Sequence, residues 1–211
     1  MSEEKPSFEE LVRRKMLRIK EVHNMEYGRT ALLVIDMQRS FMDENASLRV
    51  PQAWDILPTV KKMVDFCREV GIPVIFTEFV AQPELPNLRC DPFGPEHLMP
   101  EPGAPTGWGL PSGNSEIGME GPESPDTIDE LKPLPGELVV RGYTLDKFYG
   151  TPLDLALRGR DIRHLIFVGM MADLCLLATL FSAAMRDYRC VAIRDAITTI
   201  WPHILEAVFD I

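Results

Sequence analysis

A cysteine and an aspartate occupy positions from which they could carry out acyl-transfer chemistry together. Cys175 follows a short apolar run, 165–168, and a tight turn at Gly169, and it begins a stretch whose apolar residues recur at helical spacing. The backbone N–H groups at a helix N-terminus stabilise a thiolate, although a free cysteine can equally be a small buried hydrophobe. Asp36 ends another apolar run, 31–35, so its carboxylate stands at the carboxyl end of a predicted strand.

These two side chains predict nucleophilic attack on an acyl carbon. The sulfur of Cys175 would form a thioester, while Asp36 takes the thiol proton, passes it to a leaving amine and then activates water. Backbone N–H groups at Met171 and Cys175 would stabilise the tetrahedral oxyanion. Such a site needs a third part, a cation that keeps the carboxylate ionised and lowers the pKa of the thiol.

Five apolar runs alternate with helical patterns and predict an α/β fold, a doubly wound, mostly parallel sheet with helices on both faces. With the common strand order 3-2-1-4-5, the first and fourth strands are neighbours at the switch point where ligands bind. Asp36 and Cys175, 139 positions apart, would then meet in one crevice. The predicted strands are 31–35, 73–77, 137–141, 165–168 and 190–194, and the predicted helices begin near Ile56, at Thr151, at Cys175 and near Ile204.

Two segments fall outside this alternating core. Residues 7–24 form a predicted amphipathic helix, with Ser7 and Glu10 at the spacing of a capping box. Between 81 and 135 the periodicity disappears and prolines accumulate, which is typical of a lid, a binding loop, a subunit contact or a surface excursion without function. We therefore predict one domain over 1–211 with an N-terminal helix and a proline-rich insert.

Charge and cysteine content narrow the classes of function. The net charge of -10 argues against non-specific binding to nucleic acid or to anionic membranes, because both need a basic surface. The four cysteines contain no Cys-x-x-Cys pair, which fits reduced thiols in a cytoplasm better than a zinc cluster or a disulfide scaffold. No signal peptide or run of membrane-span length is visible. These features predict a cytoplasmic protein that acts on a small molecule.

The motifs around the two candidate residues resemble those of the isochorismatase-like cysteine hydrolase superfamily, which includes nicotinamidases, N-carbamoylsarcosine amidase and ureidoacrylate amidohydrolase. The run ALLVIDMQRSF at 31–41 is similar to the family's strand with its catalytic aspartate and a following aromatic residue, here Asp36 and Phe41. The run FYGTPLDLALRGRDIRHLIFVGMMADLC at 148–175 is similar to the approach to the nucleophile, and CVAIRDA at 190–196 to the strand after it.

The resemblance implies a Rossmann-like fold and hydrolysis of a small amide or ureido substrate through a thioester, with Asp36 and Cys175 as catalytic residues. It also implies a cis peptide bond between Met170 and Met171, immediately before the oxyanion-hole residue. A homo-oligomer is expected from the resemblance and from the N-terminal helix. The residues predicted to line the pocket are Phe41, Trp108 and Met171.

One position departs from the family pattern. The family's catalytic lysine precedes the threonine of a Gly-Thr pair by nine residues, and that count from Thr151 reaches Gly142. The nearest cations are Arg141 and Lys147, but an arginine is a poor substitute for a lysine point charge and a lysine is more often solvated. A catalytically silent relative that binds a small ligand or a protein partner is therefore a second hypothesis. Hydrolysis of a vinyl ether, as in isochorismatase, needs the aspartate but not the thiol and is a third.

No metal or other cofactor is predicted for the site. The metal-binding members of the family carry a histidine pair shortly after the first strand, where this chain has Asp43 and Glu44. Its four histidines share no ligand spacing. The chain stops at Ile211 within the last predicted helix, where relatives add a further strand, so we expect a C-terminal tail beyond this residue.

Overall fold

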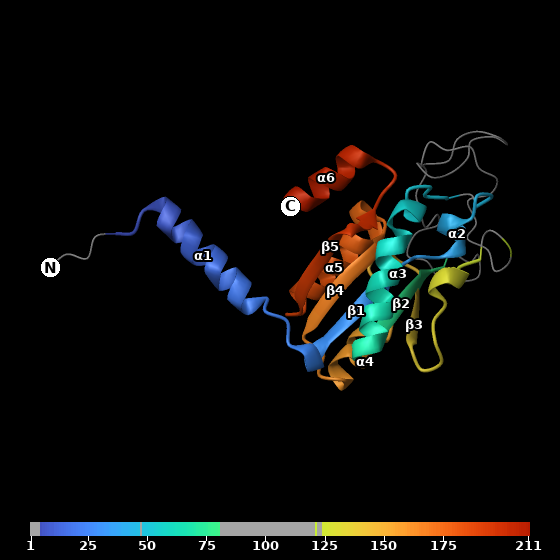
Figure 1. The fold of residues 1–211 in the computed structure, drawn as a ribbon, viewed down its shortest axis with the longest axis horizontal. Helices are drawn as coiled ribbons and strands as arrows, with labels where there is room; N and C mark the ends of the chain where they lie inside the picture. Colours follow the sequence, from blue (N-terminus) through green and yellow to red (C-terminus); the bar gives the residue numbers. More distant parts are fainter. Residues whose placement is uncertain (1–4, 47, 81–120, 122–123) are drawn as a thin grey trace.

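Five parallel strands form the sheet of the computed structural model, which describes residues 5–46, 48–80, 121 and 124–211 (Figure 1). The strands are β1 (Thr30–Ile35), β2 (Val74–Phe79), β3 (Leu138–Gly142), β4 (His164–Met170) and β5 (Arg189–Thr198). Every residue of β1, β2 and β4 is buried, as expected for central strands covered on both faces. The order β3-β2-β1-β4-β5 confirms the predicted doubly wound topology.

The described part of the chain also forms helices, some of which cover the two faces of this sheet. They are α1 (Phe8–Val22), α2 (Arg39–Met42), α3 (Ala53–Val70), α4 (Leu153–Gly159), α5 (Leu177–Met185) and α6 (Pro202–Asp210), with short turns η1 (Tyr27–Arg29), η4 (Asp129–Leu131) and η5 (Ala172–Leu176). The helix α3 packs on one face, against side chains such as Leu32 and Val168. The helices α4 and α5 pack on the other, against side chains such as Leu33 and Phe167. The alternation of side chains along each strand therefore supplies two apolar layers.

Most elements differ from their predicted bounds by a few residues, and several of these differences affect the site. The strand β4 continues through Gly169, where the sequence predicts a tight turn, to Met170. The strand β5 continues to Thr198 instead of ending at 194. The helix α4 begins at Leu153, because the hydroxyl of Thr151 accepts the Leu153 N–H at 3.3 Å and so lies ahead of the helix. Cys175 lies in the π-helical turn η5, and the regular helix α5 begins two residues later.

The N-terminal helix α1 projects away from the sheet and from the helices that cover it (Figure 1). Its predicted cap is confirmed, since Ser7 Oγ accepts the Glu10 N–H at 3.2 Å. Within the described ranges, no helix combines the length and the apolar character that a bilayer crossing requires. The cytoplasmic location stays a prediction.

Most of the proline-rich insert, 81–120 and 122–123, lies outside the described residues, and Trp108 lies there too. The described end of the insert rejoins the core at Thr127, which forms an antiparallel bridge with Gln38 just after β1. The role of the insert and the assignment of the whole chain to one domain stay predictions.

Gly169 permits the close approach of β4 to β1 where the two strands end. Its φ is +109°, and a Cβ at this position would lie 2.2 Å from the carbonyl oxygen of Ile35. Only glycine fits there, because no side chain has room beside the neighbouring backbone. The next residue on β1's side, Asp36, has a φ of 50°, a left-handed conformation that few non-glycine residues adopt. The two strand ends that carry the candidate site are therefore closely constrained.

We expect Gly169→Ala to lower the free energy of unfolding by about 3 kcal/mol, because the added methyl group forces β1 and β4 apart in a strained backbone conformation. Urea unfolding followed by circular dichroism measures this loss. Gly159→Ala is the matched control, since a Cβ there meets nothing within 4 Å, and it should change stability by less than about 1 kcal/mol. Equal unfolding midpoints for the two variants would contradict the close approach.

Candidate active site

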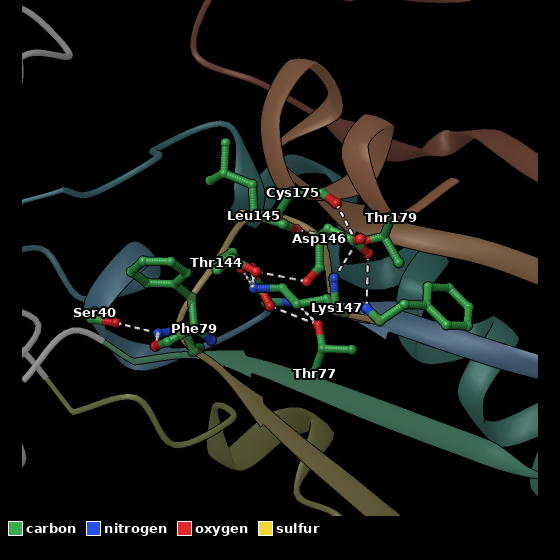
Figure 2. Close-up of polar contacts among 12 residues, drawn as sticks. Ser40, Thr77, Phe79, Thr144, Leu145, Asp146, Lys147, Cys175 and Thr179 are labelled. Atoms are coloured by element: carbon green, nitrogen blue, oxygen red, sulfur yellow. Dashed lines mark hydrogen bonds and ion pairs between the residues drawn. The ribbon is translucent and has the colours of Figure 1, made fainter. Parts of the chain in front are cut away.

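Asp36 and Lys147 form a buried ion pair at the carboxyl end of β1. Lys147 Nζ lies 2.8 Å from Asp36 Oδ2, and both side chains are 0% exposed. The hydroxyl of Thr77, on β2, donates to Asp36 Oδ1 at 2.6 Å. The ammonium also donates to the carbonyl of Thr144 at 3.3 Å and lies 4.9 Å from the ring centre of Phe79 (Figure 2). The fold therefore places a cation directly beside the candidate carboxylate.

The ammonium of Lys147 keeps its charge in this buried place. Burial alone lowers the pKa of Lys147, because desolvation disfavours the charged form. The ion pair and hydrogen bond with Asp36 outweigh this effect, and the pKa of Lys147 lies above its ordinary value. The lysine is therefore protonated at neutral pH.

Cys175 lies next to this ion pair and is 4% exposed. The charges of Lys147 and Asp36 both act on its thiol. Burial raises the pKa of the Cys175 thiol and Asp36 raises it further, whereas Lys147 lowers it, and the result lies well above the ordinary value. This direction is opposite to the one expected at a helix N-terminus, because desolvation is the larger effect. The resting thiol keeps its proton, and Asp36 stands where it can accept it.

Of the two cations considered from sequence, Lys147 reaches Asp36 and Arg141 does not. Arg141 pairs with Glu78 at 2.8 Å and with Asp126 at 2.6 Å. It lines a cavity of about 610 Å³ that contains side chains of both charges. None of the described residues that line this cavity belongs to the cluster of Asp36, Lys147 and Cys175.

Gly142 lies beside the lysine that the chain does place in the site. A Cβ at Gly142 would lie 3.6 Å from Cδ of Lys147 and 3.5 Å from Cγ2 of Thr151. Lys147 comes five residues later, in the turn after β3, and its stem passes this glycine. Lys147 therefore supplies the amine from another position of the same connection. Its side chain is buried, although most lysine side chains are exposed to solvent.

The described members of the predicted pocket wall lie near the cluster. Phe41 is buried, and its ring centre is 6.4 Å from that of Phe79, the ring beneath the Lys147 ammonium. Met171 is buried ahead of η5, and the peptide bond between Met170 and Met171 is cis, as the family resemblance implies. Contact of Phe41, Met171 and Trp108 with a substrate stays a prediction.

Possible metal ligands are dispersed in the part of the chain that the structure describes. No three His, Cys, Asp or Glu side chains gather there in a way that could hold a metal ion. His164 is buried at the amino end of β4, with Nε2 3.8 Å from Glu26 Oε1. The absence of a metal from the reaction stays a prediction.

Thr179 of α5 bridges two backbone segments. One is the connection that contains Lys147, and the other is the turn that contains Cys175. The hydroxyl of Thr179 accepts the Lys147 N–H at 3.1 Å and donates to the Cys175 carbonyl at 2.6 Å (Figure 2). The side chain is fully buried. Nothing in the sequence singles out this residue or Thr77, because threonine hydroxyls in helices commonly bond to the preceding turn and strand threonines are frequent.

Comparison with known proteins gives consistent matches. The family model of the isochorismatase domain matches residues 30–206. Ureidoacrylate amidohydrolase RutB from Cronobacter sakazakii is 28% identical over 172 residues, which cover 79% of this chain and 73% of that protein. The crystal structure of N-carbamoylsarcosine amidase from Thermoplasma acidophilum is similar with a TM-score of 0.64 and 26% identity, over 86% of this chain and 90% of that one. Nicotinamidase PncA from Bacillus subtilis shares the fold, with a TM-score of 0.65 and 24% identity over 86% and 93% of the two chains.

We expect Thr179→Val to loosen the connection that carries Lys147, because the buried Lys147 N–H loses its acceptor. The free energy of unfolding should fall by about 1–3 kcal/mol. The pH profile of Cys175 alkylation by iodoacetamide should also shift, since the ammonium moves relative to the sulfur. Thr179→Ser keeps the hydroxyl and should restore the parent profile. If the valine variant gave the parent profile, Thr179 would not position Lys147 relative to Cys175.

We expect the alkylation rate of Cys175 to keep rising as the pH passes about 9, because an ordinary thiol titrates at about 8.5 and burial raises the pKa of this one. Mass spectrometry of the iodoacetamide adducts gives the rate at each pH. The variant Cys175→Ala reports the background from the other cysteines. A rate that levelled off below about pH 7 would instead reveal a stabilised thiolate.

Proposed function

Because the chain belongs to the isochorismatase family, we propose that it hydrolyses a carbon–nitrogen bond in a small amide or ureido compound through a thioester on Cys175. The meeting of Cys175, Asp36 and Lys147 in one buried cluster carries this proposal. The substrate class is supported by the names of two relatives, ureidoacrylate amidohydrolase and N-carbamoylsarcosine amidase.

In the first half-reaction the thiol proton moves to Asp36 while Sγ of Cys175 attacks the acyl carbon. Lys147 stays protonated, because its pKa lies above the ordinary value, and its charge stabilises the developing thiolate. The carbonyl oxygen becomes an oxyanion, for which the N–H groups of Met171 and Cys175 are the proposed donors. The carbon–nitrogen bond then breaks, and Asp36 passes the proton to the leaving amine.

In the second half-reaction water replaces the amine. Asp36 takes a proton from the water as its oxygen attacks the thioester carbon. The carbon–sulfur bond breaks, the acid leaves, and the proton returns to the sulfur of Cys175. One carboxylate therefore serves in turn as base and acid, and Lys147 holds its proton throughout.

A catalytically silent protein that binds a small ligand is the second candidate, and one observation favours it. Cys175 is buried and the pKa of its thiol is raised, so the resting sulfur is a weak nucleophile. The other ground for this candidate is the glycine at position 142, where the family has its lysine. This ground is weaker because Lys147 forms the ion pair with Asp36 instead. Vinyl-ether hydrolysis differs from both, because it needs Asp36 and not the thiol.

We expect Lys147→Gln to lower the turnover of small amides or ureides by about 100-fold or more, because the cation that stabilises the thiolate is lost. Arg141→Gln should leave the turnover per folded molecule close to that of the parent. The two variants are matched, since each removes a cation paired with a buried carboxylate, of Asp36 or of Glu78, and each therefore loses stability. Assays over a substrate panel, normalised to the folded fraction from circular dichroism, separate activity from stability.

Variants of the nucleophile and of the carboxylate complete the test. Cys175→Ala and Asp36→Asn should both abolish turnover in the same assays. Turnover that survived Cys175→Ala would exclude the thioester and point to chemistry that needs only the aspartate. A folded parent chain that turned over no amide or ureide would favour the silent, ligand-binding protein.

A double variant separates the charge from the position that supplies it. Gly142→Lys combined with Lys147→Gly moves the amine to the family's usual position, which lies beside the present lysine stem. We expect the double variant to be more active than Lys147→Gly alone, because a lysine at 142 can follow the same path to Asp36. If the double variant and Lys147→Gly were equally inactive, the position of the lysine at 147, and not only its charge, would be needed for activity.

A further inference from the structure

The helix α1 leaves a continuous apolar stripe exposed. None of the residues of α1, all of which the structure describes, is buried. Exposed apolar surface of this extent on a soluble protein marks an interaction site. The stripe consists of Phe8, Leu11, Val12, Met16 and Ile19, whose exposed fractions run from 39% for Ile19 to 80% for Phe8.

Local interactions alone do not explain a stable α1. Ser7 caps the helix, and Glu10 forms exposed ion pairs with Arg13 and Arg14, at 2.7 Å each. Exposed pairs of this kind contribute little. A 15-residue helix is marginal in water, and helices in proteins gain most of their stability by packing an amphipathic face. The stripe therefore needs a partner surface.

The charge of α1 indicates what that surface is. The helix carries five basic and three acidic side chains, a net charge of +2, whereas the whole chain carries -10 and the remainder therefore -12. A basic helix is attracted to an acidic surface, and the body of another copy of this chain provides one. An anionic membrane is a poorer fit, because it would repel the acidic body to which the helix is attached.

We propose that α1 is an exchange arm whose apolar stripe docks on the body of a second copy of this chain, while the second copy's arm docks in return. The base of the arm is anchored, since Arg29 in η1 pairs with Asp161 at 2.7 Å. From this base the helix extends away from its own body (Figure 1). The body has exposed apolar side chains next to carboxylates that can meet the stripe, such as Trp54 and Phe66 on α3, which are 46% and 52% exposed and adjoin Asp55 and Asp65 in the sequence.

Analytical ultracentrifugation of the full chain over a range of concentrations tests the arm. We expect the parent chain to assemble and Leu11→Gln to raise the dissociation constant by about tenfold or more, because a buried leucine is lost from the interface. Leu17→Gln is the matched control, with the same substitution, a similar exposed fraction (54% against 50%) and a place on the opposite face of α1. It should assemble as the parent does. A parent chain that stayed monomeric, or a Leu11→Gln variant that assembled normally, would overturn the proposal.

A charge variant distinguishes two modes of assembly. In one, α1 docks on the body of the second copy, and in the other, the α1 helices of the two copies pack on each other. Arg18→Glu lowers the net charge of α1 from +2 to zero. Against an acidic body this change weakens assembly, whereas two basic arms packed on each other would associate more tightly. Tighter assembly of Arg18→Glu, or binding of the parent to phosphatidylserine vesicles in place of assembly, would overturn the proposal. Circular dichroism checks that the body stays folded in each variant.

Discussion

The buried ion pair between Asp36 and Lys147 is the interaction on which the rest of the site depends. Each ion loses several kcal/mol of hydration on burial, and either one alone would be an uncompensated charge in the core. The 2.8 Å contact, the Thr77 hydroxyl on the carboxylate and the Phe79 ring near the ammonium offset this loss. An apolar pair of similar volume would serve stability equally well or better. The presence of two charges here is therefore better explained by chemistry than by folding.

The same arrangement ties the cation to the element that carries the candidate nucleophile. Thr179 on α5 holds the backbone of Lys147 and the carbonyl of Cys175 through one hydroxyl. One turn further along α5, Ser182 donates to Asp146 Oδ2 at 2.7 Å and so holds the residue before the lysine. The connection after β3 is therefore attached to α5 at two points. A shift of this helix would move sulfur and ammonium together and preserve their spacing.

The sequence predicts those parts of the site whose positions follow from the strand topology. The meeting of Asp36 and Cys175 is predictable, because the carboxyl ends of neighbouring parallel strands share one edge of the sheet. The source of the cation is not, since a count from Thr151 assumes that the connection after β3 follows the path it takes in relatives. A lysine has a flexible four-carbon stem, so Lys147 reaches the place that a side chain at Gly142 would otherwise fill.

The sequence also could not predict the protonation state of Cys175, because that state depends on how deeply the thiol is buried. A helix N-terminus favours a thiolate only where water or charge also solvates it, and here desolvation is the larger effect. A protonated, buried thiol resists oxidation, since oxidation follows thiolate character and exposure. Under the proposed mechanism the nucleophile forms only when an acyl carbon is present to receive it and Asp36 accepts the proton. On this proposal, the sulfur of Cys175 stays protonated and unreactive beside the ion pair until a substrate binds.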